Sequence, residues 1–218
     1  MLLPGESDLA AAWRADAAAG AVAGTAPGVL EATGAELIAR WNEPHRRYHD
    51  ARHLRAVLAG VAELGDQAAQ LPAVRMAAWF HDAVYQGVPG QDEEASAVLA
   101  EQLLPALGWP PVLVEEVARL VRLTADHAGI AGDDQNAAVL ADADLAILAA
   151  PEAAYQAYAA AVREEYAQVP DEAFAAGRAF VLTRLLENPP LFRTAAGQQR
   201  WTEAARANLR RELASLRP

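Results

Sequence analysis

The sequence contains neither cysteine nor lysine. The lack of cysteine excludes disulfide bonds, thiolate zinc sites and a cysteine nucleophile, so a bound metal ion must have nitrogen and oxygen ligands. It also suits the reducing cytoplasm, which is the location we expect. The lack of lysine excludes Schiff-base and lysine-nucleophile chemistry, because all 18 basic residues are arginine.

Long apolar runs are missing too. The chain starts MLLPGESDLAAAW, without a basic segment followed by a long apolar one, and Arg, Asp or Glu interrupts each Ala-rich stretch before a membrane span is complete. We therefore expect no membrane partner. The net charge of −11 disfavours general nucleic-acid binding, because a phosphate backbone repels such a protein unless arginines cluster on one face. The oligomeric state is not predicted.

Strand patterns are absent as well, since no stretch of four or more residues alternates apolar and polar side chains. Apolar residues recur with a helical period, which predicts an all-α bundle of about eight to ten helices. We expect an N-terminal helical extension over 1–25 and one helical domain over 26–218. The predicted helices run over 7–19, 27–41, 50–65, 71–84, 92–107, 111–127, 135–149, 151–167, 171–187 and 197–215.

Polar residues interrupt the apolar faces of three of these helices. His53 borders the apolar stripe of the helix from 50, and His81 and Asp82 follow the buried-looking segment MAAWF. Asp144 is flanked by bulky apolar residues one turn away on either side. Burying an ionised carboxylate without a partner is costly, so Asp144 needs a cation, an arginine or a proton.

The economical hypothesis is that His53, His81, Asp82 and Asp144 bind one divalent ion. Two imidazoles and two carboxylates suit Mn, Co, Ni, Fe or Zn, with Mg possible. Each residue alone also has a plainer interpretation: the His-Asp dipeptide occurs a second time at His49–Asp50, a lone interior His is often a hydrogen-bonded core residue, and Asp144 could pair with an arginine. The order and spacing of the four residues favour the shared site.

Several short motifs resemble the HD superfamily of metal-dependent phosphohydrolases, whose signature is H…HD…D on a helical bundle. A bacterial subgroup shows RxYHxxxHL, WFHDxVY, NEExSA, TxxH, DxDLAILG and VRxEYxxVP…GRxxVL. This chain has RRYHDARHL, WFHDAVY, DEEASA, TADH, DADLAILA and VREEYAQVP…GRAFVL. Asp142 remains an alternative to Asp144, because residues two apart on a helix differ by about 200 degrees and only one can face the ion.

The resemblance implies hydrolysis of a phosphate ester on a small phosphorylated substrate, with a metal-activated water. The catalytic candidates are Asp82, His127, Glu94 and His49: His127 for a second metal or for protonating the leaving oxygen, and His49 and Glu94 for binding the water or a ligand imidazole. Without lysine, arginine must bind the phosphate. The candidates are Arg46, Arg52, Arg122, Arg163 and Arg178.

Two other functions fit the same residues. Some members of the superfamily are di-iron oxygenases with extra His ligands between the HD pair and the last Asp, an interval in which this chain has only His127. A non-catalytic module that binds a metal or nucleotide to regulate a partner is the third possibility.

Overall fold

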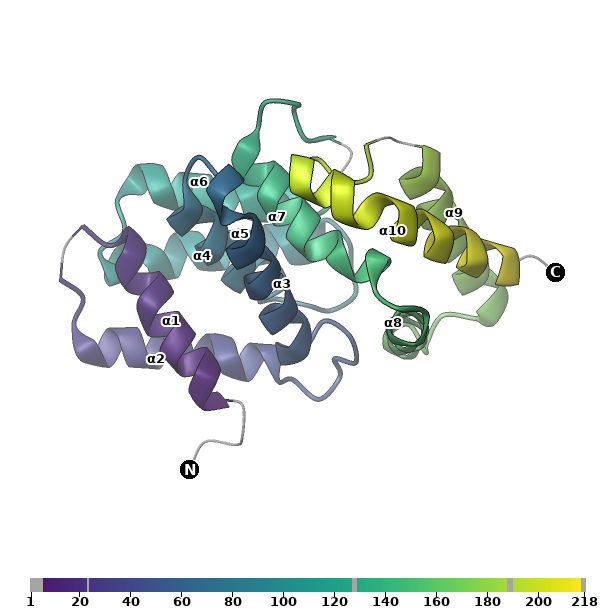
Figure 1. The fold of residues 1–218 in the computed structure, drawn as a ribbon. Helices are drawn as coiled ribbons and strands as arrows, with labels where there is room; N and C mark the ends of the chain where they lie inside the picture. Colours follow the sequence, from purple (N-terminus) through teal and green to yellow (C-terminus); the bar gives the residue numbers. More distant parts are fainter. Residues whose placement is uncertain (1–5, 23, 127–128, 188–189, 217–218) are drawn as a thin grey trace.

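The computed structural model describes residues 6–22, 24–126, 129–187 and 190–216, and these contain helices and no strand, which confirms the all-α prediction (Figure 1). None of the described helices is long and apolar enough to cross a membrane. The α-helices are α1 (Glu6–Gly20), α2 (Pro27–Trp41), α3 (Ala51–Leu64), α4 (Leu71–Phe80), α5 (Gln91–Leu103), α6 (Pro111–Leu123), α7 (Gln135–Leu145), α8 (Glu152–Glu165), α9 (Asp171–Glu187) and α10 (Ala195–Ser215). Short 3-10 turns follow three of them at η1 (Gly65–Gln67), η2 (Leu104–Leu107) and η4 (Ala146–Ala149).

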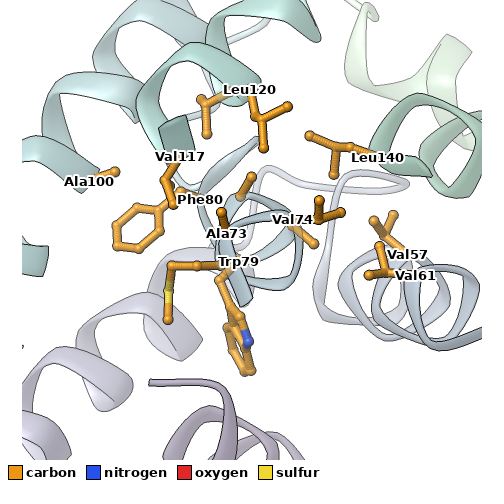
Figure 2. Close-up of a cluster of buried hydrophobic side chains, with 14 of the residues drawn as sticks. Val57, Val61, Ala73, Val74, Trp79, Phe80, Ala100, Val117, Leu120 and Leu140 are labelled. Carbon is orange, nitrogen blue, oxygen red and sulfur yellow. The ribbon is translucent and has the colours of Figure 1, made fainter. Parts of the chain in front are cut away.

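Helix α4 is the centre of the main hydrophobic core. It contacts α1, α3, α5, α6 and α7, and its side chains from Ala73 onward are buried except that of Arg75. Figure 2 shows Val74 and Phe80 of this helix among Val57 of α3, Val117 of α6 and Leu140 of α7. Because five helices pack against α4, the residues that follow its last turn are held firmly.

Helices α8, α9 and α10 form a second, smaller cluster at one end of the molecule (Figure 1). It buries Tyr155, Leu182 and Phe192 together with Leu148 of η4, against which α10 packs. The Nδ2 of Asn208 donates hydrogen bonds to the carbonyls of η4 and the residue after it. The turn that follows α7 is thus fixed between the two clusters.

Helix α1, which the sequence suggested as part of an extension, shares the main core. Trp13 packs edge-on against Trp79 of α4, with ring centroids 5.4 Å apart. The buried Asp16 carboxylate accepts hydrogen bonds from Arg75 Nη2 at 3.0 Å and from Trp79 Nε1 at 2.9 Å. This helix therefore braces the one that leads into the His81–Asp82 pair.

Four predicted helices end earlier than the apolar pattern suggested, and one of them, predicted over 111–127, ends at Leu123. The helix predicted over 71–84 ends at Phe80: the amide of Ala83 donates to the carbonyl of Phe80 in a turn, and the amide of Val84 donates to the Ser96 hydroxyl. Arg46 binds the carbonyls of Asp82 and Ala83 in this turn. The helix predicted over 92–107 becomes 3-10 at Leu104, directly before Pro105, which disfavours α-helix in the preceding residue. The helix predicted over 135–149 likewise tightens into η4 after Leu145.

Candidate metal centre

The helix ends place His53 and His81 side by side. Asp50 caps α3, its carboxylate accepting from the backbone amides of Arg52 and His53, so His53 lies in the first turn. His81 directly follows α4, and its amide donates to the carbonyl of Ala77. Only 5% of His53 and 1% of His81 is exposed to solvent. Both imidazoles are therefore presented at the junction of α3 and α4, away from bulk water.

Four donor atoms meet at this junction. The Nε2 atoms of His53 and His81 lie 3.2 Å apart. Asp144 Oδ1 lies 3.1 Å from His53 Nε2 and 3.7 Å from His81 Nε2. Asp82 Oδ2 lies 3.2 Å from His81 Nε2 and 3.8 Å from His53 Nε2. The two carboxylates thus stand close to both imidazoles.

The spacing of these atoms fits a shared cation. Ligands about 2.1 Å from one ion lie about 3.0 to 3.8 Å apart when they subtend about 90 to 130 degrees at it. In the described residues, ligand atoms of His53, His81 and Asp82 all lie within 4.8 Å of one another and form a group that can hold a metal ion. Neutral imidazole and carboxylate donors suit transition metals. The donor set therefore fits a divalent ion.

A hydrogen bond fixes the tautomer of His81. Its Nδ1 lies 2.9 Å from the carbonyl oxygen of Ala78, which can only accept, so Nδ1 carries a proton. The remaining nitrogen, Nε2, is then the one with a lone pair in the neutral ring. Because ligating imidazoles commonly donate their other N–H to a carbonyl or carboxylate, this bond presents Nε2 as a metal ligand.

The charges of the centre interact strongly. Burial would by itself lower the pKa of His81, but the carboxylates of Asp82 and Asp144 raise it to about 9. Burial would likewise raise the pKa of Asp82, and the His81 imidazole instead lowers it well below its usual range. In the metal-free protein, the protonated His81 imidazole therefore supplies the positive charge that stabilises the carboxylates of Asp82 and Asp144.

Asp142 and Asp144 face different neighbours. Asp142 is fully buried, and its carboxylate accepts hydrogen bonds from the amides of Arg193 and Thr194 and from the Thr194 hydroxyl. These bonds tie α7 to the start of α10. Burial raises the pKa of Asp142, although the same bonds oppose that effect. The structure thus brings Asp144, and not Asp142, to the two imidazoles.

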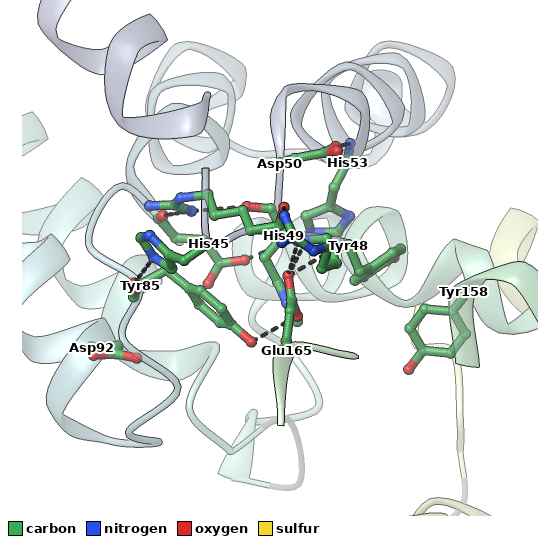
Figure 3. Close-up of polar contacts among 12 residues, drawn as sticks. His45, Tyr48, His49, Asp50, His53, Tyr85, Asp92, Tyr158 and Glu165 are labelled. Atoms are coloured by element: carbon green, nitrogen blue, oxygen red, sulfur yellow. Dashed lines mark hydrogen bonds and ion pairs between the residues drawn. The ribbon is translucent and has the colours of Figure 1, made fainter. Parts of the chain in front are cut away.

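His49 is held by a carboxylate that the sequence analysis did not single out. Glu165, at the end of α8, accepts from His49 Nδ1 at 2.7 Å and from the Tyr85 hydroxyl at 2.9 Å (Figure 3). Its other oxygen accepts from the backbone amides of Arg47, Tyr48 and His49. The side chain of Glu165 is only 2% exposed.

These bonds set the protonation of the pair. Burial would raise the pKa of Glu165, but the hydrogen bonds from His49 and from the backbone lower it to about 2. Burial would lower the pKa of His49, and the bond to Glu165 raises it instead. His49 is thereby committed to Glu165 through Nδ1. Among the described residues, the hydrogen bond of the His49 ring is the one from Nδ1 to Glu165.

Arg46 is a buried brace and not a free cation. Its guanidinium donates to the carbonyl of His49 at 2.9 Å, to that of Asp82 at 2.8 Å and to the carboxylate of Glu43 at 3.1 Å. The side chain has no exposed surface. It therefore joins the segment that carries His49 to the turn that carries Asp82.

The other predicted residues pair with groups other than the four candidate ligands or lie outside the described chain, although Arg52 lines a cavity together with His53 and Asp144. Arg122 and Glu94, both predicted site residues, form an ion pair with each other on the surface, and Arg122 also pairs with Glu101. Arg52 pairs with Asp50. Two further arginines also have protein partners: Arg163 bonds to Tyr166, Val169 and Asp171, and Arg178 to Glu212 and Tyr158. His127 lies outside the described residues.

A cavity of about 210 Å³, here named the metal cavity, opens beside the ligands. It is lined by His81, Asp82 and Asp144, by His49, and by the loop over 85–93. The loop is folded by Asp92, whose Oδ2 accepts from the amides of Gln86 and Val88.

No family model matches the chain, and no match is found among the curated proteins or the solved structures.

Proposed function

We propose that the protein is a metal-dependent hydrolase of a phosphate ester on a small molecule. The observation that carries the proposal is the convergence of His53, His81, Asp82 and Asp144, from three separate parts of the chain, on one buried point beside a cavity. Their order along the chain is the H…HD…D order of the HD superfamily, which this sequence resembles. A divalent ion such as Mn²⁺ is the cofactor that these donors suit.

The chemistry that such an ion supplies when bound is activation of a water molecule and neutralisation of charge on the phosphoryl oxygens. The chain contributes the rest. His53, His81, Asp82 and Asp144 hold the ion, and Trp41, whose ring centroid lies 5.3 Å from that of His81, keeps water from the protein side of the site. His49, oriented by Glu165, faces the same cavity and is the residue that we expect to give a proton to the leaving oxygen.

A panel of phosphate esters tests this proposal. The full chain, stripped of metal and reloaded with Mn, Co, Ni or Mg, should release phosphate from at least one ester. His81→Ala and Asp82→Ala should abolish the release while circular dichroism shows an intact helical fold. Turnover that is unchanged in these variants would contradict the proposal. Oxygen consumption by iron-loaded protein would favour the oxygenase, and metal binding without turnover of any ester would favour the regulatory module.

A further inference from the structure

A second cavity, of about 410 Å³, adjoins the metal cavity between α8 and α9. We name it the α8–α9 cavity. His49, Tyr158 and Tyr166 line both cavities. The two cavities therefore meet at His49.

The walls of the α8–α9 cavity are mostly apolar. Phe174 and Gly177 of α9 face Tyr158 and Val162 of α8 across it. An engineered cavity of about 150 Å³ with apolar walls is enough to bind benzene. The space is thus large enough for a ring-sized apolar group, and its walls favour such a group over a polar one.

The single arginine in this cavity is already neutralised. Arg178 donates to Glu212 through Nε at 2.7 Å and through Nη2 at 3.1 Å, and also to the Tyr158 hydroxyl. The side chains of Arg178 and Glu212 are only 10% and 12% exposed. An anionic group entering this cavity would therefore find no unpaired cation among its described walls.

The two cavities next to the α8–α9 cavity differ from it in the charged residues of their walls, and only one of them is lined by His49. The metal cavity has the carboxylates of Asp92 and Glu93 on its loop side. A third cavity, of about 460 Å³ between α3 and α8, is lined by the candidate ligands His53 and Asp144 and has Arg47 and Arg52 among its walls, but His49 does not line it. Because His49 lines the α8–α9 cavity and not the third one, an ester whose leaving oxygen lies beside His49 has its alcohol group next to the α8–α9 cavity.

We infer that the substrate is a phosphomonoester of an uncharged, apolar alcohol of about ring size, and that the α8–α9 cavity binds this alcohol. The inference rests on the proposed function, because the phosphoryl group must lie at the metal centre. It excludes a chain of further phosphates as the main binding element, since the described walls of this cavity offer no unpaired cation.

Binding of phosphonates tests the inference without turnover. Methylphosphonate and phenylphosphonate carry the same charged group, which the metal centre should bind alike, and differ only in the apolar part. Isothermal titration of the Mn²⁺-loaded full chain should show phenylphosphonate binding about tenfold to a hundredfold more tightly, as burial of a ring predicts.

Three leucine variants locate the ring. Gly177→Leu should reduce the preference for phenylphosphonate to near unity, because no atom lies within 4 Å of a Cβ at this position and the new side chain enters the cavity without displacing the fold. Ala176→Leu, on an exposed position of the same helix, should keep the wild-type preference. Ala157→Leu, in the cavity between α3 and α8, should keep it as well.

The outcomes separate the two proposals. If wild-type protein binds both phosphonates equally, or if Ala157→Leu removes the preference and Gly177→Leu does not, the substrate inference is wrong and the proposed function stands. If Mn²⁺-loaded protein binds neither phosphonate, both are wrong. A preference lost only in Gly177→Leu supports the inference.

Discussion

Asp142 and Asp144 lie two residues apart on α7 and serve different parts of the structure. Asp144 Oδ1 lies 3.1 Å from the Nε2 of His53, whereas Asp142 accepts three hydrogen bonds from Arg193 and Thr194. Because the helix turns by about 200 degrees over two residues, the pair joins the candidate metal centre on one side to the start of α10 on the other.

Exchange of each carboxylate for its amide should separate these roles. Asp144→Asn should weaken Mn²⁺ binding at least about tenfold, because a ligand carboxylate loses its charge. Asp142→Asn should leave Mn²⁺ affinity near the wild-type value and reduce the free energy of unfolding by about 1 to 3 kcal/mol, because a buried acceptor of three hydrogen bonds is weakened. Isothermal titration and urea unfolding measure the two effects. Equal loss of metal affinity in both variants would contradict the assignment of Asp144.

The pKa of His81 predicts opposite pH dependences for the metal-free and metal-loaded states. Its folded pKa of about 9 exceeds the value of about 6.5 expected in the unfolded chain, so its contribution to stability is fully present below pH 6.5 and is lost as pH rises through 9. Mn²⁺ must displace that proton, so its affinity should rise by up to about tenfold per pH unit over the same range.

Calorimetry checks this prediction. Titration of Mn²⁺ in buffers of different ionisation enthalpy at pH 7.5 should show release of about one proton per ion bound. Urea unfolding of the metal-free protein should show lower stability at pH 9.5 than at pH 7.5. Metal binding that releases no proton would show that His81 is neutral in the metal-free site.

The His49–Glu165 pair predicts a dependence on the leaving group. Glu165→Gln keeps an oxygen that accepts from the backbone amides over 47–49, but it removes the charge that favours a protonated His49. Hydrolysis of alkyl phosphates, whose leaving oxygen needs a proton, should fall by about a hundredfold. Hydrolysis of 4-nitrophenyl phosphate should fall much less.

Glu164→Gln is the matched control. Its side chain is 65% exposed and lies 3.6 Å from the Nε of Arg47. Steady-state rates on both kinds of ester should stay at the wild-type values in this variant. An equal loss on both esters in Glu165→Gln would mean that Glu165 only holds the fold.

Two substitutions within α1 test how strongly this helix is attached to the core. Asp16→Asn should reduce the free energy of unfolding by about 3 kcal/mol, because the buried carboxylate that binds Arg75 and Trp79 loses its charge. Asp8→Asn, which weakens an exposed pair with Arg55, should change it by less than about 1 kcal/mol. Chemical unfolding measures both variants. A stable protein with Asp16→Asn would mean that α1 adds little to the core.

The periodic apolar pattern was sufficient to predict the helices, because each one buries a face in a core. Sequence spacing also singled out His53, His81, Asp82 and Asp144, which lie in apolar surroundings where a polar residue needs an explanation. The ends of helices were harder to predict. The turn that follows α4 is held by Arg46, whose bonds to Asp82 and Ala83 span 36 and 37 residues.

Long-range partners were beyond a single sequence. The motif VRxEY specifies Glu165 and leaves Glu164 variable, but only the fold shows that Glu165 is buried against a segment 116 residues earlier. The interpretation of Arg46 as a phosphate ligand likewise could not be weighed against a role as a buried brace, because its acceptors are backbone carbonyls that carry no sequence signal. Residue type suggests what a side chain can bind, and the fold decides its partner.

The most direct test of the metal centre is an anomalous difference map from a crystal of the full chain grown with Mn²⁺. We predict a peak within coordinating distance of the Nε2 atoms of His53 and His81 and of carboxylate oxygens of Asp82 and Asp144. A crystal with full Mn²⁺ exposure and no peak at this point, or with its strongest peak elsewhere, would contradict the account.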